Sequence, residues 1–97
     1  MLVVISVNRM DSNGVQVCVA RPQHNAHSAQ TYPSEAAARA VLLDFGIAEK
    51  VLDDSLKLLT QVGANQPLKF PRLDVPQHEL LEKGFELAEG TQLGISQ

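Results

Sequence analysis

The alternation of apolar and polar residues at the start of the chain predicts a β-hairpin. Residues 2–10 and 15–21 are two apolar-rich runs that the segment DSNG separates. Every second residue is valine or isoleucine over 3–7 and valine over 15–19. Asn13 and Gly14 suit a type I turn that is closed by a glycine in the left-handed region, which gives a three-residue loop with a bulge. We therefore expect two antiparallel strands joined by a tight loop.

The expected loop also sets the register of the hairpin. If Asp11 lies opposite Val15, then Val7 lies opposite Val19. A slip of one residue would mix polar side chains with the valines, so burial favours this pairing over that alternative. One face of the hairpin then carries six apolar side chains, with Gln16 exposed on the other: Val3, Ile5, Val7, Val15, Val17 and Val19.

The next segment predicts a short third strand and an unusually apolar helix. Residues 29–32 suit a strand before Pro33. Ser34 is a good N-cap for a helix that runs to Phe45. This helix carries two apolar stripes, one of which contains Ala36, Ala40 and Leu43. A helix that is apolar nearly all round is buried, either in the core or against a partner.

A second helix is predicted over residues 48–62, where the apolar residues fill one half of the helical wheel and polar residues fill the other. Two pairs spaced i,i+4 are expected on its polar half, Lys50 with Asp54 and Asp53 with Lys57. Gly63 is the expected end of the helix.

Glycines are expected to end two of the helices in the same way. LLDFGI at 42–47 and LLEKGF at 80–85 each place a glycine where a helix favours left-handed backbone. Gly46 and Gly84 should therefore have positive φ angles.

The last third of the chain predicts an extended arm and a short helix. The three prolines Pro67, Pro71 and Pro76 rule out a central strand over residues 64–75, although Leu68, Phe70 and Leu73 should pin this arm to the body. A short helix is expected from Pro76 to Lys83. The tail 86–97 has a weak pattern, and it either frays or adds an edge strand near 85–87.

These elements predict an α+β fold: an antiparallel β-hairpin or three-stranded meander, two main helices on one face, and a short C-terminal helix. We expect a single domain over residues 1–97. Its parts are the hairpin or meander 1–33, the two-helix unit 34–62, the arm and short helix 63–85, and the tail 86–97.

Composition and charge narrow the class of protein. Hydrophobic residues make up 44% of the chain and charged residues 20%, a globular balance. The net charge of −3 argues against general nucleic-acid binding, which needs a positive surface. The N-terminal apolar run is broken early by polar residues, so we expect neither a signal peptide nor a membrane span. A lone cysteine fits a cytoplasmic location.

One stretch raises the question of a metal site. Cys18, His24 and His27 are spaced C-x5-H-x2-H, which is no established ligand pattern, and a fourth donor such as His78 would be distant in sequence. A polar loop after a strand explains the same residues. We therefore expect no metal site and no cofactor.

The sequence contains only weak matches to known catalytic motifs. HELLE at 78–82 has Glu82 where the zincin pattern H-E-x-x-H has its second histidine. Asp53 and Asp54 are adjacent and point apart on a helix, so they do not form an acid and base pair. A nucleophilic Cys18 would need an orienting group that the sequence does not identify. We expect no catalytic residues and no enzyme.

The function that we expect from the sequence is a small non-enzymatic protein-interaction module that binds a second copy or another protein. The helices at 34–45 and 48–62 have more apolar surface than one hairpin face covers. The expected outward stripe is Leu43 with Ala36 and Ala40, or Leu56 with Leu52. The alternative is a small regulatory nucleic-acid-binding protein that uses a local basic patch: Arg9, Arg21 and Arg39, or the segment Lys69-Phe70-Pro71-Arg72.

Overall fold

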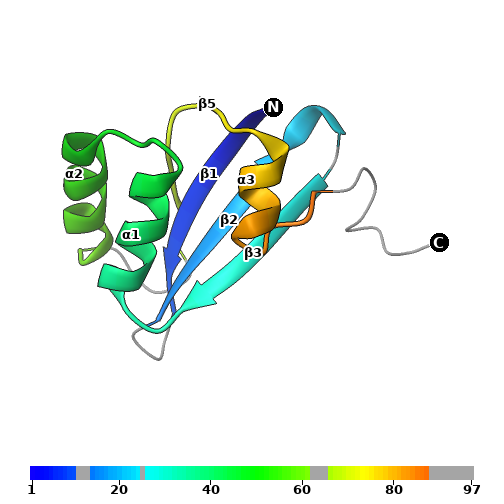
Figure 1. Ribbon diagram of the computed structural model, residues 1–97. Coiled ribbons are helices and arrows are strands. Elements are labelled where there is room, and N and C mark those ends of the chain that lie inside the picture. The colour runs from blue at the N-terminus through cyan, green and yellow to red at the C-terminus, as the bar shows by residue number, and fades with distance from the viewer. Residues whose placement is uncertain (11–13, 25, 62–65, 88–97) are drawn as a thin grey trace.

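Figure 1 shows the computed structural model, which describes residues 1–10, 14–24, 26–61 and 66–87. It confirms the α+β class, with two main helices and a short third helix against an antiparallel sheet. In chain order the elements are β1 (Leu2–Arg9), β2 (Val15–Arg21), the 3₁₀ turn η1 (Pro22–His24), β3 (Ala26–Tyr32), α1 (Glu35–Asp44), α2 (Glu49–Leu59), β4 (Leu68–Lys69), β5 (Leu73–Asp74) and α3 (Gln77–Glu82).

The hairpin forms, but its predicted register is wrong. Val7 lies opposite Val17 rather than Val19. The last described backbone bond before the loop runs from the Met10 amide to the Gly14 carbonyl at 2.8 Å, so the chain turns one residue earlier than expected. This moves each pairing by two residues, and a shift of two keeps every side chain on its own face.

The predicted buried face of the hairpin is confirmed, because all six of its apolar side chains are at most 2% exposed. Gln16, expected to be exposed on the other face, is half-buried. The six side chains form one core with residues of all three helices and of the arm. The larger members of this core from outside the hairpin are Leu42, Phe45, Leu52, Leu56, Leu59, Phe70, Leu80 and Phe85.

Strands on both sides of the hairpin widen the sheet. β3 is longer than the expected strand at 29–32 and pairs with β2 along its whole length, from Val15 opposite Tyr32 to Arg21 opposite Ala26. On the other side, β4 and β5 pair with β1, giving the order β3-β2-β1-β4. The arm is therefore an interrupted edge strand, and the Phe70 amide donates to the Ile5 carbonyl at 2.9 Å between its two parts.

The helix ends follow the predicted capping pattern. Gly46 has a φ of 102° and Gly84 a φ of 87°, as expected. Gly46 and the residue after it donate to the carbonyls of Leu43 and Leu42, and Gly84 and its successor repeat this pattern on α3. These paired bonds define Schellman motifs. At the other end of α1, the Ser34 hydroxyl accepts from the Ala37 amide at 3.2 Å, which confirms the N-cap.

Helix α2 is shorter than predicted, because it ends at Leu59 rather than at residue 62. The Thr60 hydroxyl donates to the Lys57 carbonyl at 2.7 Å, which satisfies one of the carbonyls that a helix end leaves without an intrahelical partner. Gly63, the expected end of this helix, lies outside the described residues.

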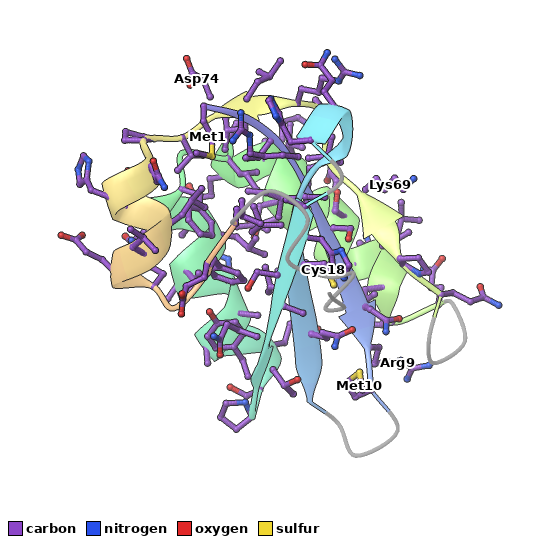
Figure 2. All side chains as sticks on the ribbon, turned by 90° about the vertical axis from the view of Figure 1, so that its right-hand side faces the viewer. Met1, Arg9, Met10, Cys18, Lys69 and Asp74 are labelled. Atoms are coloured by element: carbon purple, nitrogen blue, oxygen red, sulfur yellow. The ribbon has the colours of Figure 1, made fainter. Side chains whose placement is uncertain are left out.

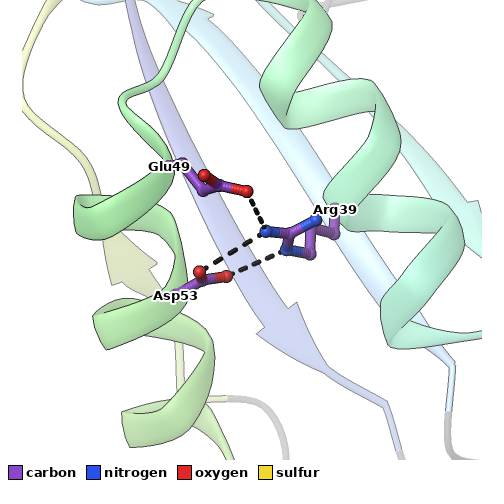
Figure 3. A network of polar contacts seen from close by, with 3 residues as sticks. All are labelled: Arg39, Glu49 and Asp53. Carbon is purple, nitrogen blue, oxygen red and sulfur yellow. Dashed lines mark hydrogen bonds and ion pairs between the residues drawn. The ribbon is translucent and has the colours of Figure 1, made fainter.

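An ion-pair network fixes α1 to α2 (Figure 3). Arg39 on α1 donates to Asp53 and to Glu49, each at 2.9 Å. Asp53 therefore does not form the predicted pair with Lys57, whereas Lys50 and Asp54 do approach to 3.5 Å. The hydrogen bond to Asp53, with that to Glu49, raises the pKa of the Arg39 guanidinium.

The C-terminal part of the described chain packs against the end of α1. The rings of Phe45 and Phe85 lie 5.7 Å apart, and Lys83 sits above the Phe45 ring. Residues 85–87 do not form the edge strand that was considered for them, and residues 88–97 lie outside the described part. Within the described residues, no helix has the length and apolar character needed to cross a membrane.

Candidate functional site

The residues considered for a metal site are spread over three elements. Cys18 lies in the middle of β2 and points away from the helices (Figure 2), and His27 on β3 shares that side of the sheet. His24 lies in η1, and His78 lies on α3, which packs on the opposite side. Within the described ranges, no three His, Cys, Asp or Glu side chains gather closely enough to hold a metal ion.

The environment of Cys18 does not favour a reactive thiolate. Burial raises the pKa of its thiol, and a hydrogen bond with Ser6 on the neighbouring strand opposes that effect. Because the thiolate is the nucleophilic form, a raised pKa leaves less of it at neutral pH. Cys18 is better described as a small side chain in the middle of a sheet.

The carboxylates considered for catalysis have ordinary partners. Glu79 lies 3.9 Å from Lys83 on the same short helix, and Asp53 is bound to Arg39. Asp54 faces Lys50. These contacts are those of helix surfaces, and the two carboxylates that do converge, Asp53 and Glu49, are both bound to Arg39.

The sheet face opposite the helices is not covered by any of the described helices (Figure 1). We call it the outer face. Its side chains form cross-strand rows, of which the central one joins Ala29, Cys18, Ser6 and, at the β4 edge, Lys69. In Figure 2, Cys18 and Lys69 both lie on this side of the strands, away from α3. On the three long strands the outer face consists of Leu2, Val4, Ser6, Asn8, Gln16, Cys18, Ala20, His27, Ala29 and Thr31.

The composition of the outer face is unusual, since its ten positions on β1, β2 and β3 contain no Asp, Glu, Lys or Arg. Solvent-facing sides of antiparallel sheets are normally polar. Here most side chains are small or uncharged, and those of β1 and β2 other than Leu2 are half-buried even though no described helix covers them. Sequence reasoning assigned Cys18 to this face but did not recognise the face as a surface of its own.

The predicted outward stripes on the helices are only partly present. Leu52 and Leu56 are 0% and 3% exposed and belong to the core, so the expectation that they face a partner is wrong. They share this core with the valines of the sheet and with Phe70 of the arm. The second stripe does face outward in part, because Ala36 and Ala40 are exposed and Leu43 is half-buried.

Helix α2 has a different exposed edge. Val51 and Leu58, seven residues apart, are 42% and 53% exposed. Val51 also lines a groove of about 430 Å³ between the start of α2 and the arm, together with Ile47, Ala48, Phe70 and Pro71. This apolar edge is narrow, and Lys50, Asp54 and Lys57 lie beside it.

A cationic hollow lies at one end of the sheet, where β2 passes into η1. Arg21, His24 and Arg72 line it together with Gln23 and the first residues of β1. Arg21 and Arg72 are 51 positions apart in the sequence. They meet because β5 pairs with β1 next to the end of β2.

The arginines of the predicted basic patch are not brought together. Arg9 ends β1 at the loop end of the hairpin, whereas Arg21 ends β2 at the opposite end. Arg39 is engaged by two carboxylates of α2. Lys69 lies on β4 opposite Ser6, and Figure 2 shows it apart from Arg9.

Comparisons of the chain with protein-family models, with curated proteins and with solved structures found no match.

Proposed function

We propose that this chain is a cytoplasmic, non-enzymatic interaction module that associates with a second copy of itself through the outer face of its sheet. The observation that carries the proposal is the absence of Asp, Glu, Lys and Arg from the ten outer-face positions of β1, β2 and β3. Depletion of charged residues is the compositional feature that distinguishes the centre of a protein interface from the remaining surface.

The size of the outer face supports the same proposal. The three long strands have seven or eight residues each. At about 3.3 Å per residue and about 4.8 Å between strands, the sheet with its arm measures roughly 25 by 15 to 20 Å. The arm adds two charged residues at the edge of this area, Lys69 opposite Ser6 and Asp74 opposite Leu2. Two such faces in contact bury on the order of 1,000 Å² in total, the lower limit for a specific interface.

The shape of the face suits a symmetric pair. The central row of Ser6, Cys18 and Ala29 is made of small side chains, and larger ones lie in the rows on either side. Small residues allow two sheets to approach closely. A two-fold axis near this row would bring the same patch of each copy into contact, as in most homodimers.

Helix α2 is the weaker candidate for the interface. Its exposed apolar edge comes from Val51 and Leu58 on a helix of eleven residues. At about 1.5 Å per residue this edge is only roughly 16 Å long. The groove beside Val51 enlarges the apolar area, but the charges of Lys50, Asp54 and Lys57 limit it on one side.

A matched pair of lysine substitutions tests this proposal. Ala29→Lys adds a charge to the outer face at an exposed position, and Leu58→Lys adds the same charge to the exposed edge of α2. We expect Ala29→Lys to raise the dissociation constant of the dimer by about a hundredfold or more, because like charges that face each other across an interface cost several kcal/mol. Leu58→Lys should change the dissociation constant of the dimer by less than about threefold. Sedimentation equilibrium at micromolar concentration measures both.

Two results would contradict the proposal. One is a wild-type chain that keeps the 10.5 kDa monomer mass at every concentration tested. The other is a dimer that Leu58→Lys dissociates and Ala29→Lys does not, which would move the interface to α2. Circular dichroism of each variant shows that a change in mass does not come from unfolding.

A further inference from the structure

We propose that the hollow between the end of β2 and the arm binds the phosphate group of a small phosphorylated molecule, with Arg21 and Arg72 as the two anchoring groups. This site is separate from the self-association proposed above and does not rest on it. His24 and Gln23 also line the hollow.

The first argument is the pairing of charges. Arg39 has two carboxylate partners, and Lys50 and Lys83 have one each. By contrast, neither Arg21 nor Arg72 forms an ion pair or hydrogen bond with another side chain of the described part of the chain. Two uncompensated guanidinium groups therefore line one hollow, in a protein whose net charge is −3.

The second argument is the position of the two arginines. Arg21 is the last residue of β2 and is half-buried, so the sheet holds its backbone. Arg72 immediately precedes β5, which pairs with β1 through Val3 and Leu73. Both backbones are therefore fixed by strand pairing to the same end of β1. The backbone at the two arginines therefore loses little conformational entropy when a ligand binds.

The third argument concerns the chemistry of the ligand. A guanidinium presents a planar fork of N–H donors that matches two oxygens of a phosphate or a carboxylate. One fork satisfies a carboxylate, which has only two oxygens. Two forks together match the three free oxygens of a phosphate monoester. Leu2, Val3 and Val4 supply an apolar wall for the organic part of such a molecule.

Inorganic phosphate is the probe that tests this site. It is titrated into the full chain at constant ionic strength, with binding followed by the backbone amide resonances, and acetate is titrated in parallel. We expect phosphate to shift the resonances of residues 21–24 and 72, and to bind more tightly than acetate. Arg21→Gln and Arg72→Gln should each weaken phosphate binding by about tenfold or more, the loss of a charge-assisted contact.

Lys57→Gln is the matched control, since it removes the same charge from an exposed position on α2. It should change the affinity by less than about twofold, because exposed charges at this distance are largely screened. Equal responses to phosphate and acetate would overturn the choice of a phosphate ligand. Equal losses of affinity in all three variants would show general charge attraction, and unchanged affinity in the two arginine variants would remove the site altogether.

Discussion

Replacing Val19 by aspartate is expected to cost at least about 3 kcal/mol of folding free energy and to leave much of the chain unfolded at room temperature. Val19 is 0% exposed in the centre of β2, among the other valines of the inner face. The core offers no cation to the new carboxylate, since no polar or charged residue of the described chain is buried. Urea denaturation followed by circular dichroism measures the loss.

The control for this variant is Thr31→Asp, on the exposed outer side of β3. In the monomer it places the same carboxylate on the same sheet but in contact with water, so at protein concentrations below those at which the dimer forms the expected loss is about 1 kcal/mol or less. If both variants lose similar amounts of stability, the assignment of the two faces of the sheet is wrong.

Truncating Leu56 to alanine is expected to destabilise the protein by about 2 to 5 kcal/mol, whereas truncating Leu58 should cost less than about 1 kcal/mol. The two leucines lie on the same helix, but Leu56 is 3% exposed and Leu58 is 53% exposed. Removing a buried side chain leaves a cavity that its neighbours only partly fill. Thermal and urea unfolding of the two variants measure the difference.

Comparing Leu56→Ala with Leu58→Ala also tests which side of α2 faces the core. The sequence left this point open. If Leu58→Ala proves the more costly change, α2 is rotated about its axis relative to the arrangement described above. Equal and small losses would mean that α2 contributes little to the core.

The buried faces of the elements were predictable from the sequence, because they depend on periodicity alone. Alternation identified the valine face of the hairpin, and the glycines and Ser34 identified the ends of α1. Periodicity does not distinguish two registers that differ by two residues, and this is why Val7 was paired with Val19 instead of Val17. The choice between these registers depends on the conformation of the loop.

Contacts between distant segments were the part that the sequence did not reveal. The apolar half of α2 was identified, but not that the arm returns along β1 and that its Phe70 joins the same core as Leu52 and Leu56. The arm was expected to pack against the body of the protein. Its two short strands, on either side of Pro71, were not predicted because prolines argue against strand structure. Arg21 and Arg72 line the same hollow because the arm returns along β1, which the sequence did not reveal.

The reactivity of Cys18 tests the central claim, self-association through the outer face, most directly. Cys18 is the only cysteine of the chain and lies in the central row of that face. Its rate of reaction with a maleimide is measured at fixed pH over a series of protein concentrations. We expect the rate to fall by at least about tenfold as the dimer forms, because contact with the second copy excludes the reagent, and to stay constant for Ala29→Lys. A rate that remains constant while the wild-type mass doubles would contradict the account, since the dimer would then use another surface.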